Sequence, residues 1–282
     1  MLQKQHPELF EGVGKLRDHE VKLHIDPNVT PIAQPHRRIP FHLQKEIETL
    51  LAQDIIEPVK GPTQWVSPTV TPIKPNDSSR VRLCLDMRAT NQAILRTRYV
   101  TPTLDDLVHD LTGATRFSKL DLSRGYTQLV LHPDSRNIST FSTHVGLFRF
   151  KRLFFGISSA SEVFQHTISQ TLAGLKGCLN VSDDILVYGK TQAEHDANLQ
   201  AVIQRLLQCG LTLAKDKCVF NQPSVDYYGH TFSAEGVAIQ QKHVEALLAM
   251  TPPTNPAEVK SFLSSATYSS RFIPNSVRRC AN

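Results

Sequence analysis

The chain has 282 residues, enough to bury a substantial core in one large domain or in two to three subdomains. Hydrophobic residues make up 40% and charged residues 20%, and no long apolar run occurs, so the composition argues against a disordered chain and against a membrane span. The formal net charge of +5 favours a polyanionic partner.

The first part of the chain is predicted to hold little regular structure. Residues 1–40 are rich in Pro, His and charge, and we expect an extended lead-in or linker over residues 1–35. The first residues contain no apolar signal core, so we expect an intracellular, cytoplasmic protein. Apolar residues at helical spacing predict a helix over residues 41–54, and prolines around Trp65 predict edge strands and turns over residues 61–75.

Three helices are predicted in the middle of the chain. Thr103 opens a capping-box pattern, and Gly113 ends the helix that follows. Apolar spacing predicts a second helix over residues 161–173. A third and longer helix runs from a capping box at Thr191 to Gly210.

The last part of the chain changes from strand-like to helical sequence. Strand-like segments lie at residues 211–213, 217–220 and 227–232, and helices are predicted over residues 241–250 and 256–268. The five cysteines are widely spaced, embedded in apolar sequence and without zinc-ligand spacing, which is typical of reduced thiols: Cys84, Cys178, Cys209, Cys218 and Cys280.

Adjacent carboxylates at Asp183 and Asp184 are the strongest chemical signal. They lie between two short apolar segments that read as strands, so they occupy the turn. A solvated turn is the alternative interpretation. Asp121 ends another strand-like segment, and if the strands are neighbours in one sheet, three acids gather at one edge. That ligand set is the one that two-metal phosphoryl transfer requires.

Several blocks, in this order, resemble the reverse transcriptase domain of LTR retrotransposon polyproteins, most closely the gypsy-type elements. The resemblance covers nearly the whole chain. It rests on residues 117–128, 155–160 with 163–165, and 182–189, with further support from residues 81–91, 210–213, 217–220, 228–230, 260–263 and 271–274.

The resemblance implies an α/β (α+β) chain with the right-hand polymerase fold. Fingers are expected at residues 36–95 and 129–158, the palm at residues 96–128 and 159–234, and the start of a thumb or connection segment at residues 235–282. The implied activity is an RNA-directed DNA polymerase that transfers nucleotides to a primer 3′-hydroxyl by two-metal chemistry. Its implied partners are an RNA or DNA template with a primer and dNTPs, with no membrane.

The resemblance also implies roles for individual residues. Asp121, Asp183 and Asp184 would hold two Mg²⁺ ions, with Mn²⁺ as a substitute, and Lys217 aligns with a proposed general acid. The implied nucleotide-binding residues are Arg82, Tyr126, Phe155, Gly156 and Lys74. The implied primer and template residues are Arg88, Asn91, Gln128, Tyr227, Tyr228, Gly229 and His230. A core or solvated-strand position is the alternative for Tyr126, Lys217 and the residues from Tyr227 to His230, and a surface arginine on an alternating strand is the alternative for Arg82.

The chain departs from the family pattern in places. Val181 stands where the commonest metal block has Tyr, and Phe154 where Pro is frequent. The chain ends where the connection and ribonuclease H region would begin, and it contains no protease or integrase sequence, so we expect a fragment or degraded copy of a polyprotein. Ribonuclease H activity is suggested only by association with the family, because the sequence shows no second cluster of acidic residues that could carry it.

Two other functions remain open on the sequence. One is a nucleic-acid-binding remnant without catalysis, which the truncation and Val181 favour. The other is a structural or assembly role of a domesticated element, which no feature of the sequence favours. Salt-sensitive binding without Mg²⁺-dependent extension would distinguish the first of these from the polymerase.

Overall fold

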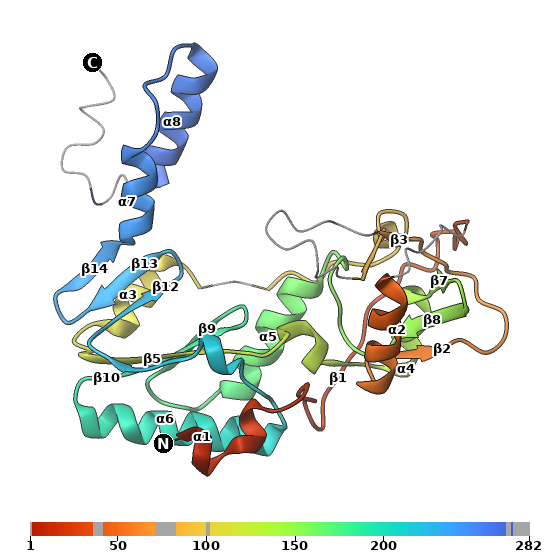
Figure 1. Cartoon of the computed structure of the whole chain (residues 1–282), viewed down its shortest axis with the longest axis horizontal. Helices are drawn as coiled ribbons and strands as arrows, with labels where there is room; N and C mark the ends of the chain where they lie inside the picture. Colours follow the sequence, from red (N-terminus) through yellow and green to blue (C-terminus); the bar gives the residue numbers. More distant parts are fainter. Residues whose placement is uncertain (1, 36–41, 71–82, 100–101, 269–271, 273–282) are drawn as a thin grey trace.

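The computed structural model describes residues 2–35, 42–70, 83–99, 102–268 and 272. Three regions are visible (Figure 1). A central antiparallel sheet and a small sheet region lie at the two ends of the long axis, and a helical arm projects upward from the end that holds the central sheet. The expected mixture of helices and strands is confirmed.

The central sheet has the strand order β11-β5-β10-β9. It consists of β11 (Val219–Gln222), β5 (Arg116–Asp121), β10 (Asp184–Gly189) and β9 (Cys178–Val181). Helices α5 (Ala160–Leu172) and α6 (Gln192–Cys209) pack against this sheet, where Leu120, Ile185 and Val187 are fully buried. Because successive side chains of a strand point to opposite faces, the residues next to these three in β5 and β10 point to the other face of the sheet.

A second core covers that opposite face. It is built from α3 (Leu104–Leu111) and a three-stranded sheet of β12 (Ser224–Tyr227), β13 (His230–Ser233) and β14 (Gly236–Ile239). Phe117 and Leu186 of the central sheet pack there with Leu107, Tyr227 and Phe232. Asp121 and Asp184 share this face with Phe117 and Leu186, because the four positions alternate with the buried set beneath them.

The small sheet region lies at the far end of the molecule from the helical arm (Figure 1). It combines α2 (His42–Ala52), the sheet of β2 (Ile56–Pro58), β8 (Gly146–Phe150) and β7 (Phe141–Thr143), and the pair of β3 (Thr69–Val70) and β4 (Cys84–Leu85). Parallel pairing of β1 (Glu20–Val21) with β6 (Val130–Leu131) ties the lead-in to this region. The remaining short elements are α1 (Leu2–Gln5), η1 (Pro7–Phe10), η2 (Thr90–Gln92), η3 (Gly125–Gln128), α4 (Pro133–Arg136), η4 (Asn137–Ser139) and η5 (Lys215–Lys217).

The arm consists of α7 (Gln241–Leu248) and α8 (Pro256–Tyr268). The Asn255 side chain accepts a hydrogen bond from the Glu258 N–H at 2.9 Å, which satisfies a free donor in the first turn of α8. Across the described residues, no helix has both the length and the apolar character needed to cross a membrane.

Most predicted elements are confirmed, and three details are wrong. The segment at residues 227–232 is not one strand but a hairpin, because Tyr228 and Gly229 adopt left-handed φ angles of 48° and 80° between β12 and β13. Residues 211–213 form only an isolated bridge through Leu213, and the lead-in contains short helices and a strand instead of extended chain alone. Of the predicted strands at residues 61–75, only β3 lies among the described residues.

Candidate active site

The acids come together through strand register. Asp121, at the end of β5, is the antiparallel Cα partner of Asp184, at the start of β10. Asp183 occupies the turn before β10, where Ser182 has a left-handed φ of 56° and the Asp183 carbonyl accepts a hydrogen bond from the Leu122 N–H at 2.9 Å. The predicted strand, turn and strand around the acids are thus confirmed.

Gln165 on helix α5 holds the turn between β9 and β10 in place. The Ser182 N–H donates to Gln165 Oε1 at 2.6 Å, and Gln165 Nε2 donates to the Asn180 carbonyl at 3.0 Å. Gln165 is itself buried. One side-chain amide therefore fixes both sides of the turn, since its acceptor and its donor each have a backbone partner.

Lysines pair with two of the three acids. Lys217 Nζ lies 3.1 Å from both carboxylate oxygens of Asp121, and Lys119 Nζ lies 3.2 Å from Asp184 Oδ2. Burial raises the pKa of Asp121, Lys217 opposes that shift, and the negative charges of Asp183 and Asp184 add to it. The three carboxylates therefore lie within electrostatic reach of one another.

The donor set matches a hard divalent ion in chemistry, because carboxylate oxygens are the ligands that Mg²⁺ prefers. Within the described part of the chain, however, no group of three or more His, Cys, Asp or Glu residues is arranged to hold a metal ion. Asp121 and Asp184 are turned to Lys217 and Lys119 instead. The strands are neighbours as expected, but the three side chains do not form a ready-made ligand cluster.

An aromatic cluster lies beside the acids. The Tyr126 ring centroid is 4.7 Å from that of Phe155 and 5.0 Å from that of Phe164. A Cβ added to Gly125 would lie 3.1 Å from Phe164 Cζ and 3.3 Å from Asp183 Cβ, so a larger residue there would push Phe164 or Asp183 away. Phe155 is 55% exposed and forms the open edge of the cluster.

The loop after Phe155 is held by Asn91. Gly156 has a φ of 108°, which favours glycine, and its carbonyl accepts a hydrogen bond from Asn91 Nδ2 at 2.8 Å. Asn91 Oδ1 accepts from the Ser158 N–H at 2.9 Å. Both ends of the Asn91 amide therefore serve this loop in the structure.

The other predicted nucleotide and template residues have different surroundings. Arg88 is exposed, and its guanidinium donates to both carboxylate oxygens of Asp86 at 2.8 and 2.6 Å. Arg82 and Lys74 lie outside the described residues. Gln128 is fully buried, and its amide bonds the Ser123 carbonyl at 2.6 Å and both backbone groups of Thr212 at 2.8 and 2.9 Å. This burial leaves Gln128 no surface for a template strand, and its role is to hold the η3 turn.

The residues from Tyr227 to His230 form the β12–β13 turn. Tyr227 is buried, and its hydroxyl donates to the Asp184 carbonyl at 3.2 Å. His230 is also buried, with Nδ1 3.0 Å from the Tyr228 carbonyl, and Gly229 adopts the left-handed conformation. Tyr228 is 45% exposed, so it presents the accessible ring of this turn.

The sequence reasoning missed Lys119 and Gln165. The period of two along β5 places Lys119 on the face of Asp121, a signal that was present in the sequence. Gln165 had no local signal, because its partners lie in a different element. The two departures from the family pattern are both buried: Val181 packs in the second core, and Phe154 stacks on Phe150 with centroids 4.2 Å apart.

Comparisons with known proteins show what this chain is similar to. The family model described as "Reverse transcriptase (RNA-dependent DNA polymerase)" matches residues 73–232. The retrovirus-related Pol polyprotein from transposon 297 of Drosophila melanogaster is 30% identical over 250 residues, covering 87% of this chain and 23% of the relative. The corresponding polyprotein from transposon gypsy, also of Drosophila melanogaster, is 30% identical over 237 residues, covering 82% of this chain and 23% of the relative. The chain thus spans less than a quarter of the length of these curated relatives.

Solved structures show the same fold. A foamy viral protease-reverse transcriptase in complex with double-stranded DNA matches with a TM-score of 0.85 at 22% identity, over 98% of this chain and 50% of that chain. The foamy viral enzyme in complex with an RNA/DNA hybrid matches with a TM-score of 0.79 at 22% identity, over 95% of this chain and 37% of that chain.

Proposed function

Because the chain belongs to the reverse transcriptase (RNA-dependent DNA polymerase) family, we propose that it carries the nucleotidyl-transfer centre of an RNA-directed DNA polymerase. The observation that carries the proposal is the register of β5 and β10, which sets Asp121 opposite Asp184 with Asp183 in the adjoining turn. The substrates are a primer 3′-hydroxyl on an RNA or DNA template and an incoming dNTP. The relatives are Pol polyproteins of which this chain covers 23%, so the proposal concerns this domain alone.

The acids would hold the metal ions. Divalent metal is general to this family, and bound Mg²⁺ or Mn²⁺ would acidify the primer hydroxyl and neutralise the triphosphate. Asp121, Asp183 and Asp184 are the residues that would supply the ligands. Lys217, beside Asp121, would carry a proton toward the departing pyrophosphate. Lys119, whose Nζ lies 3.2 Å from Asp184 Oδ2, would compete with the ion for that carboxylate.

The aromatic cluster would receive the sugar and base of the nucleotide. Tyr126 would exclude a ribose 2′-hydroxyl by contact with its ring, which Phe155 and Phe164 hold in place. Gly156 would allow a close backbone approach. Arg82 and Lys74 would bind the triphosphate, a task suited to multi-donor cations.

Primer and template would lie along the face that carries the acids. Tyr228 at the β12–β13 turn would contact the primer, while Tyr227 couples that turn to the Asp184 backbone. Fingers at residues 36–95 and 129–158, a palm at 96–128 and 159–234, and a thumb or connection segment from residue 235 would surround the duplex. We place this activity in the cytoplasm.

Primer extension tests the proposal. The purified chain should extend a primed RNA template with dNTPs in the presence of Mg²⁺, and Asp183→Asn should abolish extension while leaving the fold intact. Wild-type rates in Asp183→Asn would reject the proposed centre. A circular dichroism spectrum of each variant controls for folding.

A nucleic-acid-binding chain without catalysis is the second candidate. The pairing of Asp121 with Lys217 and of Asp184 with Lys119 favours it, because each lysine competes with a metal ion for its carboxylate. Salt-sensitive binding of a primed template with no extension at any Mg²⁺ or Mn²⁺ concentration would support this candidate over the polymerase.

A further inference from the structure

Arg152 is a buried cation that bonds to three separate segments. Its Nη1 donates to the Gly14 carbonyl at 3.1 Å and to the Thr127 carbonyl at 3.2 Å, and its Nε donates to the Asp54 carbonyl at 3.3 Å. The residue is only 3% exposed. The three acceptors belong to the lead-in, to η3 and to the turn between α2 and β2.

Burying the charged Arg152 guanidinium costs free energy of desolvation, which its hydrogen bonds to three backbone carbonyls offset only in part. None of the ion pairs between described residues includes Arg152, although Lys15, Lys151, Arg136 and Arg149 around it all have carboxylate partners. Burial lowers the pKa of the Arg152 guanidinium, opposed in part by Asp54. A buried apolar side chain would avoid this desolvation cost, so the guanidinium is better explained by the geometry it imposes than by stability alone.

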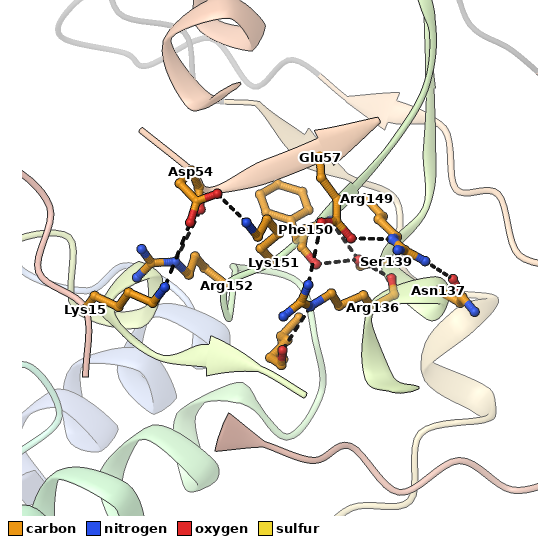
Figure 2. Close-up of polar contacts among 11 residues, drawn as sticks. Lys15, Asp54, Glu57, Arg136, Asn137, Ser139, Arg149, Phe150, Lys151 and Arg152 are labelled. Atoms are coloured by element: carbon orange, nitrogen blue, oxygen red, sulfur yellow. Dashed lines mark hydrogen bonds and ion pairs between the residues drawn. The ribbon is translucent and has the colours of Figure 1, made fainter. Parts of the chain in front are cut away.

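Figure 2 shows how the surrounding ion pairs fix one end of this arrangement. Asp54 lies between Lys151, with which it forms an ion pair, and Lys15, whose Nζ is 4.0 Å from Asp54 Oδ2. Asp54 has a left-handed φ of 56°, so its turn is constrained as well as paired. The ion pairs and the turn therefore hold the Asp54 carbonyl in place. Arg152 hydrogen-bonds this carbonyl through Nε and the Thr127 carbonyl of η3 through Nη1.

The other end of the arrangement is the aromatic cluster of Tyr126, Phe155 and Phe164. Thr127 follows Tyr126 within η3, and Arg152 precedes Phe155 by three residues. Backbone hydrogen bonds from Leu153 N–H to the Leu129 carbonyl at 2.9 Å and from Leu131 N–H to the Lys151 carbonyl at 2.8 Å join the same two segments. Two backbone hydrogen bonds and the Arg152 guanidinium thus join the segment that carries Tyr126 to the segment that carries Phe155.

We propose that Arg152 is a positioning residue that fixes η3 against the segment before Phe155 and thereby sets how strictly the Tyr126 ring excludes ribonucleotides. The proposal rests on the proposed polymerase function. It concerns a residue that does not touch the substrate, and it predicts a change in sugar selection, which loss of folded protein alone would not produce.

The test compares Arg152→Met with Arg149→Met. Arg149 lies on β8, three residues before Arg152, and its guanidinium pairs with Glu57 and Asn137, so it controls for removal of a guanidinium from the same cluster. The measurement is the ratio of kcat/KM for a dNTP to that for the matching rNTP on a primed RNA template. Arg152→Met should lower this ratio at least fivefold and Arg149→Met should leave it within twofold. Arg152→Lys, which keeps a buried donor, should fall between wild type and Arg152→Met.

Hydrogen exchange gives a second measurement that does not depend on activity. The Thr127 and Leu129 amides, which bond within η3, should exchange faster in Arg152→Met or in Arg152→Lys than in wild type or Arg149→Met. An unchanged sugar ratio in an active Arg152 variant, or unchanged exchange of η3, would overturn the proposal. If the wild-type chain incorporates no nucleotide at all, the proposed polymerase function fails, and the exchange of η3 still decides whether Arg152 positions it.

Discussion

Asp121 and Asp184 are direct partners across the β5–β10 strand pair, yet each carboxylate contacts a different lysine. The backbone therefore brings the acids together, while the Asp121 carboxylate pairs with Lys217 and the Asp184 carboxylate with Lys119. This relationship separates two questions that mutagenesis can answer: whether the acids are needed for extension, and whether the lysines limit the binding of metal.

Asp121→Asn should reduce primer extension by about a thousandfold or more, because a neutral amide replaces a proposed metal ligand in a centre that depends on charge neutralisation. Fold loss should be small, since the substitution also removes repulsion from Asp183 and Asp184. Extension rate and melting temperature are measured together. Asp110→Asn, an exposed acid on α3, is the matched control and should keep full activity. Full activity in Asp121→Asn would contradict the assignment.

Lys119→Met should lower the Mg²⁺ concentration that gives half-maximal extension. The Lys119–Asp184 pair is partly exposed, so its removal frees about 0.5–1 kcal/mol for metal binding, or about two- to fivefold in concentration. A Mg²⁺ titration of the extension rate measures the change. Lys176→Met removes an exposed lysine elsewhere and should leave the titration unchanged. A higher Mg²⁺ requirement in Lys119→Met would show that the lysine assists the ion.

Tyr126→Val should let ribonucleotides into the site, because the variant removes the ring that packs between Phe155 and Phe164. The preference for dNTP over rNTP should fall by about a hundredfold, equivalent to about 3 kcal/mol. Tyr126→Phe keeps the ring and should keep the preference. Equal preferences in the wild type and in Tyr126→Val would indicate that Tyr126 is only a core residue.

Local chemistry explains which parts of the fold were predictable from sequence. The capping box at Thr103, with Asp106 closing it, and the Asn255 cap of α8 have the expected hydrogen bonds, because each depends on residues within one turn. The strand run at residues 227–232 was misread, since aromatic and β-branched residues favour strand on both sides of Tyr228 and Gly229. Gly229 alone carried the turn signal.

In the candidate site, too, only what depends on local sequence and strand pairing could be predicted. The three acids could be located because strand ends and strand pairing constrain backbone positions. The orientation of a polar side chain depends on distant partners, and Gln128 shows this clearly: it bonds Thr212, 84 residues away in sequence. Neither periodicity nor spacing specifies such a contact, so Gln128 was assigned to the template when it is a buried support of η3.

Gln128→Leu should destabilise the fold by at least about 2 kcal/mol, because the buried Thr212 N–H and the Ser123 and Thr212 carbonyls lose their partner. Urea unfolding measures the loss. Gln192→Leu, at an exposed position at the start of α6, should change stability by less than about 0.5 kcal/mol. A stable Gln128→Leu variant with weakened template binding would restore the assignment made from sequence.

Cys178 should make the fold less stable at high pH. Burial raises the pKa of this thiol from 9.0 to about 12, so the unfolded chain loses the proton at a lower pH than the folded chain does. The contribution of the thiol to stability is present below pH 9 and falls as the pH rises toward 12. Urea unfolding at pH 8.5 and 10.5 should therefore show a drop in the wild type that is about 1–2 kcal/mol larger than in Cys178→Val, which removes the thiol and suits a strand. Equal drops in the two proteins would show that the Cys178 thiol titrates normally in the folded chain.

Alkylation with iodoacetamide at pH 8.5 gives an independent check, because the thiolate is the reactive form and Cys178 should be modified only after unfolding.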